Sequence, residues 1–248
     1  MKIFTLFALL LFATCLSAQV EVNNGGWFGF GSDRVKGNGD VVMDGRDIDG
    51  FTGVDACCSF RVELAQGPFE VRVEAESNLL EFIETTVRGK TLYVKYTDRA
   101  NFKSTEPITV YVTLPDLELV DASSSSRITG TTPFTGKDLT LDVSSSADIE
   151  LTFTGDRVQV DASSSGRIEL KGKAERFRAD ASSAGKIAAR DLSSDDAIAD
   201  VSSGARIEVH VNNSLRADAS SGGSVEYTGS PRDVNTDTSS GGSVRGRN

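Results

Sequence analysis

The sequence predicts an all-β protein whose chain winds into one parallel β-helix, a solenoid with coils of about 19 residues. Three observations predict it: a recurring octet, strand-like alternation on both sides of the octet, and no helical periodicity. Seven octets begin 18 to 21 residues apart: DASSSSRI at 121, DVSSSADI at 142, DASSSGRI at 161, DASSAGKI at 180, DVSSGARI at 200, DASSGGSV at 218 and DTSSGGSV at 237.

Each octet is predicted to be a tight bend between two short strands. Apolar residues occupy every second place before the Asp, as in Val158 and Val160, and again after the bend, as in Ile168 and Leu170. This alternation gives each strand one buried face and places the Asp on the other face. The Ser, Ala and Gly residues between the two strands are typical of tight bends.

A unit of about 19 residues with two short strands cannot bury its own apolar face, so the copies are expected to stack. The spacing leaves no room for a crossover helix. The sequence lacks the LxxLxL signature of leucine-rich repeats, which excludes that class. Propeller blades need about 40 residues, about twice the repeat found here. We therefore expect ten or so stacked coils, about 4.8 Å apart.

The N-terminal segment, residues 1–18, reads as a secretory signal peptide. Lys2 precedes an apolar run from Ile3 to Leu16, and small residues precede Gln19, so cleavage is expected after Ala18. The alternative is a lipoprotein acylated on Cys15, a reading that the preceding Thr14 disfavours. No other run approaches the roughly 20 apolar residues of a membrane helix, so the mature chain is expected to have no transmembrane segment.

Two further segments follow the signal peptide. Residues 19–40 form a Gly-rich leader, in which Trp27, Phe28 and Phe30 are expected to cap the first coil or, less favoured, to dock a partner. Residues 41–248 form the β-helix domain. Within it, residues 69–119 alternate cleanly but are more aromatic, which predicts wider and less regular coils.

The chain is acidic, with a formal net charge of -10. Proteins that bind nucleic acid or anionic membranes need a basic footprint, which such a chain does not offer. Neither partner is therefore expected.

The mature chain has two cysteines, Cys57 and Cys58, in the segment DACCSFRV that begins at Asp55. This segment fits the octet, with the two cysteines in the places of Ser-Ser. The pair is therefore interpreted as a variant of the structural turn, and small Cys is a common substitute for Ser or Ala. A metal site is disfavoured because there is no CxxC partner and the single histidine, His210, is far along the chain. The sequence leaves open whether the two thiols are reduced or bridged.

No catalytic constellation is found. There is no GxSxG motif, His210 has no triad partners in its surroundings, and Asp195-Asp196 reads as a solvated loop pair. No catalytic, cofactor-binding or metal-binding residue is assigned, no cofactor is expected, and the ligand-binding residues stay unknown. The protein is predicted not to be an enzyme. A polysaccharide-active β-helix enzyme is the least favoured reading, because fold analogy alone supports it.

Stacking should align the octet aspartates in a column about 4.8 Å apart, where bare carboxylates repel. We expect each Asp to accept hydrogen bonds from its own turn. We also expect the basic sixth residue after it to offset the column: Arg61, Arg127, Arg167, Lys186 and Arg206. The alternative is that the column is a binding face for a glycan, a cation or a surface polymer.

The segment ITVYVTLPDLELVDASSSSRI, followed by serial D-A-S-S-x-G-x-I coils, resembles the bacterial head GIN domain family. That family is described as autotransporter adhesin heads of Bacteroidetes. The resemblance covers roughly Val41 to Val244 and brings no catalytic motif. It implies a right-handed β-helix, export, and an adhesive or envelope role.

These observations lead us to expect an exported, non-enzymatic, adhesin-like binding module of the cell envelope or surface. Its location would be the periplasm, the outer surface or the extracellular space. Its partner would be a glycan, a cell-surface polymer or another protein. The alternative is a purely structural envelope protein that assembles into homo-oligomers through its end coils.

Overall fold

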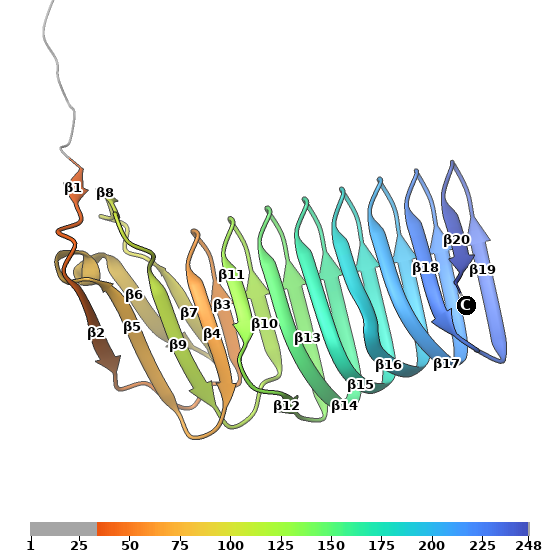
Figure 1. Cartoon of the computed structure of the whole chain (residues 1–248), viewed down its shortest axis with the longest axis horizontal. Coiled ribbons are helices and arrows are strands. Elements are labelled where there is room, and N and C mark those ends of the chain that lie inside the picture. Colours follow the sequence, from red (N-terminus) through yellow and green to blue (C-terminus); the bar gives the residue numbers. More distant parts are fainter. Residues whose placement is uncertain (1–33, 248) are drawn as a thin grey trace, which may run out of the picture. The chain divides into compact units, whose positions relative to one another are not determined.

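The computed structural model describes residues 34–247, and within them the chain forms stacked β-strands (Figure 1). Each regular coil has two faces joined at one edge by a tight turn. We define the first face as the strands that precede each turn and the second face as the strands that follow it. At the opposite edge the long ribbons curve from the second face to the first without a break (Figure 1).

Within the described residues, thirteen strands make up the regular coils. They are β3 (Gly53–Ala56), β4 (Arg61–Gln66), β10 (Leu119–Ala122), β11 (Arg127–Gly130), β12 (Phe134–Thr135), β13 (Asp138–Val143), β14 (Asp148–Ala162), β15 (Arg167–Ala181), β16 (Lys186–Val201), β17 (Arg206–Ala219), β18 (Ser224–Gly229), β19 (Asp233–Thr238) and β20 (Ser243–Gly246).

The register between coils confirms the repeat. Asp142, Asp161 and Asp180 are direct partners in neighbouring strands, and so are Val160 and Ala179. Because the side-chain period of a strand is two residues, this register keeps the inward residues of successive coils in common columns. The inward column Leu139, Val158, Phe177, Ala197, Leu215 is at most 3% exposed.

The turns are β-turns in which both central residues have left-handed backbone angles. In the turn Ser163 to Gly166, φ is 49° at Ser164 and 63° at Ser165, and the Gly166 N–H donates to the Ser163 carbonyl at 2.8 Å. Such angles are unfavourable for residues other than Gly. Here the neighbouring coil holds the turn in place, since the Ser165 N–H donates to the Ser183 carbonyl at 3.1 Å. The equivalent bond recurs from coil to coil and over-determines the strained conformation.

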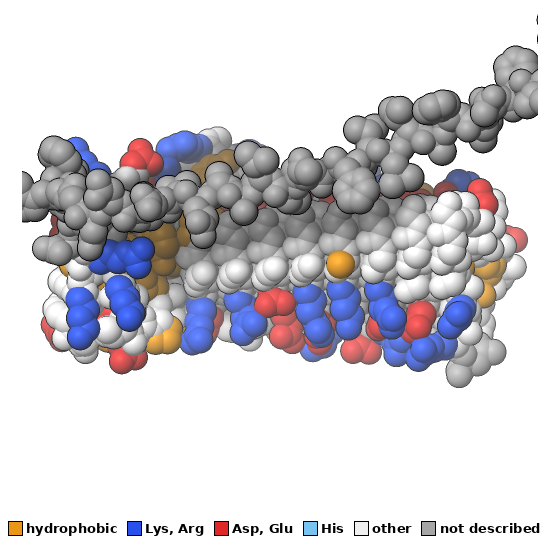
Figure 2. All heavy atoms as spheres, turned by 90° about the horizontal axis from the view of Figure 1, so that it is seen from above, with side chains coloured by type: hydrophobic (Ala, Val, Ile, Leu, Met, Phe, Trp, Pro, Cys, Tyr) orange, Lys and Arg blue, Asp and Glu red, His pale blue; other side chains and the backbone are white. Residues whose placement is uncertain are grey.

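The fourth turn position faces inward and admits only small side chains in the regular coils. Ser126, Ala147 and Ala205 are at most 2% exposed at this position. At Gly185 a Cβ atom would lie 2.1 Å from the Ala162 carbonyl oxygen of the preceding coil. At Gly185 the close approach between coils therefore leaves no room for a Cβ atom, whereas other coils accept Ala or Ser at this position. Seen from the turns, Figure 2 shows Lys and Arg side chains in a row beside this edge.

The N-terminal part of the fold departs from the expected wide coils. It contains β1 (Val35–Lys36), β2 (Val41–Arg46), β5 (Glu70–Glu76), the 3-10 helix η1 (Ser77–Phe82), β6 (Ile83–Arg88), β7 (Thr91–Tyr96), β8 (Phe102–Lys103) and β9 (Thr109–Leu114). The strand pairs β2–β5, β5–β9 and β6–β7 are antiparallel, so the prediction of wider, less regular coils over residues 69–119 is wrong for these pairs. In the same segment β7 and β9 do pair in parallel with β3 and β4 of the stack. The clean alternation in the sequence cannot distinguish the two strand directions. These strands close one end of the stack, and fewer coils follow than the ten expected.

Glu76 joins separate segments of this N-terminal part through hydrogen bonds. Its carboxylate accepts hydrogen bonds from the Gly39 N–H at 2.8 Å, the Thr105 N–H at 2.9 Å and the Thr105 hydroxyl at 2.6 Å. The Thr105 hydroxyl is the main reason that the pKa of Glu76 is lowered to about 2, with the two backbone N–H groups adding to the effect. Residues near Gly39, which the sequence places in the leader, are therefore held by the folded unit. Trp27, Phe28, Phe30, Cys15 and the signal peptide lie outside the described residues.

The other end of the described stack is open. Every residue of β19 is exposed, and Val234 is 45% exposed although its column partner Leu215 is buried. Thr236 and Thr238 occupy the inward places that Ala217 and Ala219 fill in the preceding coil. Polar residues at these places suit a terminal coil with water on one side.

Cys57 and Cys58 occupy the turn positions that the octet assigns to them, and a disulfide joins them. Cys58 has a φ of 66° and Ser59 of 64°, close to the 52° and 62° of Ser124 and Ser125 in the next coil. The Ser59 N–H donates to the Ser124 carbonyl at 3.0 Å. The interpretation of the pair as a variant turn is confirmed by this geometry.

Replacing both cysteines by Ser is expected to change the free energy of unfolding by less than about 2 kcal/mol. The hydrogen bonds that hold this turn are backbone bonds, and a bridge between adjacent residues closes almost no loop in the unfolded chain. Urea denaturation of the double variant measures the change. A loss of the cooperative transition would contradict the expectation.

Replacing Ala184 by Gly is expected to raise the free energy of unfolding by roughly 0.5 to 1 kcal/mol, because Ala184 has a φ of 62° that Gly adopts without strain. Three other turns already carry Gly at this place: Gly204, Gly222 and Gly241. The matched control is Ala188→Gly in β16, which is expected to lower stability by a similar amount. Thermal and urea unfolding of both variants test the difference in sign.

Candidate functional site

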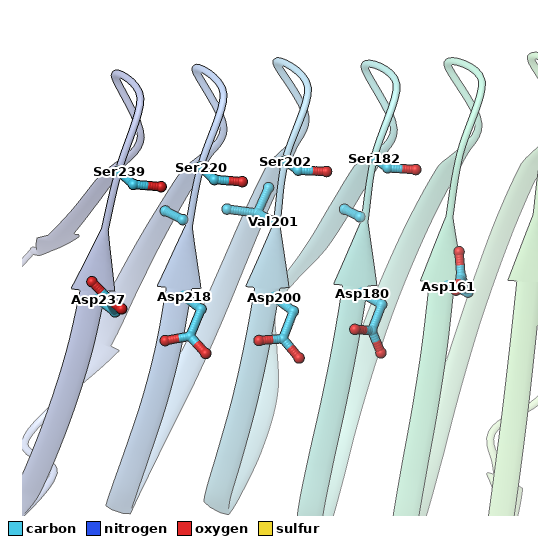
Figure 3. Close-up of a pocket in the computed structure, with 12 residues that line it drawn as sticks. Asp161, Asp180, Ser182, Asp200, Val201, Ser202, Asp218, Ser220, Asp237 and Ser239 are labelled. Atoms are coloured by element: carbon cyan, nitrogen blue, oxygen red, sulfur yellow. The ribbon is translucent and has the colours of Figure 1, made fainter.

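The octet aspartates form a continuous column on the first face, with direct partners in neighbouring strands. Its members are Asp55, Asp121, Asp142, Asp161, Asp180, Asp200, Asp218 and Asp237. Beside the column, Ser182, Ser202, Ser220 and Ser239 line up near the turns, each close to the Asp of its own coil (Figure 3). Between the two rows lies a groove of about 330 Å³, which we call the aspartate groove.

The expectation that each Asp accepts hydrogen bonds from its own turn is wrong. Within residues 34–247, neither a turn N–H nor a Ser hydroxyl donates to Asp121, Asp142 or Asp161; the turn N–H groups bond to carbonyls instead. Burial raises the pKa of Asp161, and the carboxylate of Asp142 raises it further. The pKa of Asp121 and Asp142 is raised for the same two reasons, with Asp55 and Asp121 as the respective neighbours.

The bases that approach the column are not the ones expected. Arg178 donates to Asp180 at 3.0 Å and to Asp200 at 2.9 Å. Arg216 donates to Asp218 at 2.7 Å. Both arginines lie two residues before an Asp, on the same face of the same strand, where a side chain can reach sideways.

The basic residues six places after the Asp lie on the second face and meet other acids. Arg127 pairs with Asp148 at 2.9 Å, and Arg167 pairs with Glu169 at 3.2 Å. The turn separates the two faces, so these bases cannot offset the column. The sequence pattern predicted their position correctly and their partners wrongly.

A second, larger groove of about 730 Å³ crosses the coils on the first face, and we call it the arginine groove. It lies between two outward columns that the strand register aligns. One column is Arg157, Arg176, Asp196, Ser214, Asp233, and the other is Gln159, Arg178, Ile198, Arg216, Asn235. Between the two columns runs the backbone of the inward column that contains Phe177 and Leu215, whose side chains are buried.

Most charged groups of the arginine groove are turned toward partners beside it. Arg157 makes two hydrogen bonds of 2.6 Å with Asp138, and these bonds lower the pKa of Asp138. Asp196 accepts hydrogen bonds from the Ser214 hydroxyl and from the Asn213 amide, which lower its pKa. Arg176 differs, because its nearest acid among the described residues is Glu175 at 3.9 Å and both side chains are more than half exposed.

Ile198 gives the arginine groove an exposed apolar side chain on the outward face, at 37% exposure. The same outward column carries Arg178 and Arg216 in the neighbouring coils and Gln159 and Asn235 in the coils beyond them. The octet pattern did not predict this groove. Aligning the residues two and four places before each Asp would have shown the arginines and Ile198 in common columns.

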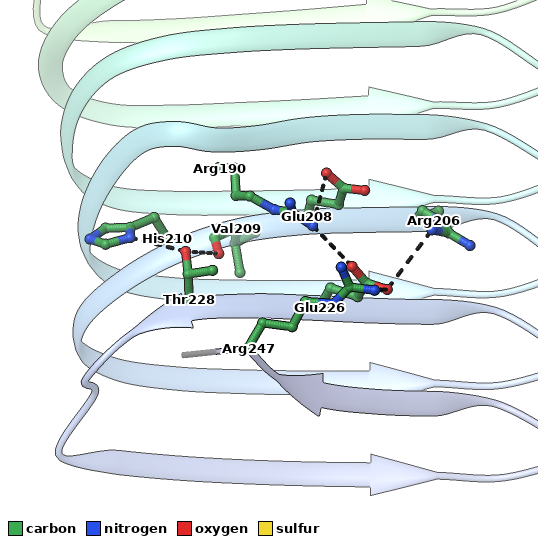
Figure 4. A network of polar contacts seen from close by, with 8 residues as sticks. All are labelled: Arg190, Arg206, Glu208, Val209, His210, Glu226, Thr228 and Arg247. Atoms are coloured by element: carbon green, nitrogen blue, oxygen red, sulfur yellow. Dashed lines mark hydrogen bonds and ion pairs between the residues drawn. The ribbon is translucent and has the colours of Figure 1, made fainter.

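The residues that the sequence offered as candidates for catalysis, His210, Asp195 and Asp196, do not form one site. His210 lies on the second face, where its Nδ1 is 3.0 Å from the Thr228 hydroxyl (Figure 4). Asp195 and Asp196 lie within β16 and not in a loop, so that expectation is wrong; Asp196 lines the arginine groove, and its register partner is Ser214 and not His210. Across residues 34–247 there is no cluster of three His, Cys, Asp or Glu side chains arranged to hold a metal ion.

Near the open end, Glu226 gathers several arginines on the second face (Figure 4). It is 8% exposed and lies 3.0 Å from Arg190, 3.0 Å from Arg247 and 3.9 Å from Arg206. Arg190 also contacts Glu208 at 3.4 Å. This network of three arginines and two glutamates ties the last coils together.

At pH 7 Asp161→Asn is expected to be more stable than Asp180→Asn by roughly 0.5 to 1 kcal/mol. The first change removes an unpaired carboxylate that its neighbour repels, whereas the second removes an acceptor of Arg178. Because the folded-state pKa of Asp161 is raised, its unfavourable contribution is present above that pKa and disappears as the pH falls through it. The stability that Asp161→Asn gains at pH 7 from removal of this carboxylate should therefore be absent near pH 3.

Urea unfolding at pH 7 and at pH 3 measures this difference. Asp116→Asn, an exposed loop position outside the column, is the control and is expected to stay within about 0.5 kcal/mol of the wild type. Equal losses for Asp161→Asn and Asp180→Asn would restore the view that every Asp is held by its own turn.

Comparison with solved structures shows the same fold in proteins of low sequence identity. An adhesin from Bacteroides fragilis, titled putative, superimposes with a TM-score of 0.80 at 16% identity, covering 86% of this chain and all of that one. A putative adhesin from Parabacteroides merdae gives 0.73 at 20% identity, covering 88% of this chain and 100% of that one. A Parabacteroides distasonis protein, titled putative lipid binding protein, gives 0.72 at 19% identity, covering 87% and 100%.

Among curated proteins no relative matches this chain. Within the described residues no helix is long and apolar enough to cross a membrane. The sequence profile of one family, described as "Putative auto-transporter adhesin, head GIN domain", matches residues 50–231. The match spans all the regular coils up to the strand β19, and the chain therefore belongs to the head GIN domain family.

Proposed function

We propose that this protein is an exported, non-enzymatic, adhesin-like binding module that holds its ligand in the arginine groove of the first face. The observation that carries the proposal is the groove itself, where an exposed Ile198 lies among arginine side chains on a rigid sheet. Concave sites with apolar walls and a few polar groups are the usual form of a ligand site.

Export is supported by the composition of residues 1–18, which has the n-region, apolar core and small-residue end of a signal peptide. Membership of a family described as an adhesin head supports a role outside the cytoplasm. The proposed place of action is the periplasm, the outer surface or the extracellular space.

A binding role is favoured over catalysis by the way the polar groups repeat. From Asp121 to Asp218 each Asp of the column has equivalents in the coils on either side, so no single pair is set apart as an acid and a base. Catalysis needs groups whose environments push their pKa values apart at one place. The candidate partners are a cell-surface polymer, a glycan, another protein or a lipid, and they differ in what they require of the groove.

A purely structural envelope role is the second candidate, and the open coil at β19 favours it. An exposed edge strand is a template for pairing with another chain. In that case copies would assemble through their end coils. Sedimentation velocity over a wide concentration range separates the two roles, because only end-to-end assembly raises the mass with concentration.

The binding role is tested with fluorescently labelled protein, residues 19–248, on isolated envelopes of a Bacteroidetes bacterium. We expect saturable binding that Ile198→Glu weakens at least tenfold. Replacing an apolar side chain that contacts the ligand by a charged one removes the contact and adds the cost of desolvating the charge. Met43→Glu is the matched control, because Met43 is 47% exposed at the other end of the stack, and it should bind like the wild type.

Circular dichroism melts of both variants confirm that they fold. Equal binding by the wild type and Ile198→Glu would contradict the assignment of the groove. Absence of saturable binding together with concentration-dependent assembly would favour the structural role.

A further inference from the structure

We infer that the Cys57–Cys58 disulfide is a redox-active site, which exchanges with small thiols from outside while the fold stays unchanged. The bridge lies on the turn between β3 and β4, so it is separate from the arginine groove and goes beyond the proposed function. Three features of this turn lead to the inference: the fold does not need the bridge, a thiol can approach it, and the two cysteines are adjacent.

The same turn forms elsewhere in the stack without a bridge. Ser123 and Ser124 occupy the places of Cys57 and Cys58 in the next coil, and φ is 52° at Ser124 against 66° at Cys58. The closing bond of the turn is also the same, since the Phe60 N–H donates to the Cys57 carbonyl at 3.3 Å and the equivalent bond of the next coil measures 3.1 Å. A reduced Cys57–Cys58 pair therefore has a native turn conformation available.

The bridge also contributes little to holding the turn in the stack. Backbone hydrogen bonds do this, from the Cys57 N–H to the Val94 carbonyl at 3.3 Å and from the Ser59 N–H to the Ser124 carbonyl at 3.0 Å. Neither bond involves a sulfur atom, so both persist when the bridge opens. A cross-link between adjacent residues also removes hardly any freedom from the unfolded chain.

A small thiol can reach the bridge from solvent. Both cysteines are half-buried, and the next turn residue, Ser59, is exposed. The turn between β3 and β4 lies at the edge of the stack where all the regular turns project (Figure 1). Structural disulfides resist reduction by glutathione, whereas exposed ones are the labile and regulatory ones. Position and exposure thus place this bridge in the second group.

The chemistry is a thiol–disulfide exchange in two stages. An external thiolate attacks one sulfur atom of the bridge, forms a mixed disulfide with it and releases the neighbouring sulfur as a thiolate, which takes up a proton. A second external thiolate then attacks the external sulfur of the mixed disulfide and releases the other cysteine. Two electrons have then reduced the bridge to two thiols, and two external thiols have been oxidised to one disulfide.

Adjacency makes the exchange reversible without a lasting adduct. In the mixed disulfide the free cysteine is the direct neighbour of the one that carries the external thiol, so it attacks at a high effective concentration. It displaces the external thiol and closes the bridge again. The pair is therefore suited to transfer electrons and unsuited to hold a partner covalently.

The first test asks whether glutathione opens the bridge in the folded protein, residues 19–248. The protein is equilibrated in buffers of reduced and oxidised glutathione, quenched with acid and alkylated, and its free thiols are counted by mass spectrometry. Millimolar glutathione should reduce at least half of the protein. The reduced fraction should rise from one tenth to nine tenths over a roughly hundredfold change in [GSH]²/[GSSG], as a two-electron couple requires.

Urea denaturation of the oxidised and the reduced protein gives the second readout, and the two midpoints should agree. Reduction by dithiothreitol without reduction by glutathione would overturn the inference, because a strong dithiol also opens structural disulfides. A bridge that opens only in urea, or a reduced protein without a cooperative transition, would likewise overturn it and make the disulfide a structural element.

The variants Cys57→Ser and Cys58→Ser test the role of adjacency. Each keeps one thiol and has no neighbour to displace glutathione, so with oxidised glutathione each should accumulate at least about tenfold more mixed disulfide than the wild type. The double Ser variant is the control and should form none. Serine is the residue of the other octets at these places, and urea transitions confirm that the variants fold. Equal accumulation in the wild type and the single variants would overturn the inference.

Discussion

The fold depends on the backbone hydrogen bonds that join each coil to the next in strict register. These bonds run through the strands and continue through the turns, where the Ser165 N–H meets the Ser183 carbonyl. Because the turn is part of the ladder, two successive residues are held at left-handed φ values that side chains normally avoid. The register also determines which side chains are neighbours on the surface, because equivalent positions of successive coils fall into columns.

Columns have an electrostatic consequence that a single turn would not have. Asp142 and Asp161 repeat one residue type at one place, and the strand spacing brings their carboxylates together. Toward the open end of the stack Arg178 and Arg216 relieve the column, whereas Asp121 to Asp161 have no such cation. The same arginines line the neighbouring groove, so the charge balance of one column shapes the surface beside it.

Each end of the stack has an edge strand with unpaired backbone groups, and the two ends differ in how this edge is covered. Antiparallel strands and the Glu76 hydrogen bonds close the N-terminal end. The last coil instead places Thr236 and Thr238 where the preceding coil has alanines, and Glu226 binds the arginines around it. A solenoid needs both devices, because stacking always leaves an edge at each end.

The sequence by itself determined the coil, its length and its inward residues, because the octet and the two-residue alternation depend only on local chain geometry. It also identified Cys57 and Cys58 as turn residues. It could not give the antiparallel pairing of β2, β5 and β6, since alternation is the same in both strand directions. Only the tertiary structure decided which charges meet: Arg178 reaches the aspartates and Arg167 does not, because the turn places them on opposite faces. The arginine groove likewise exists only between coils, where residues far apart in sequence become neighbours.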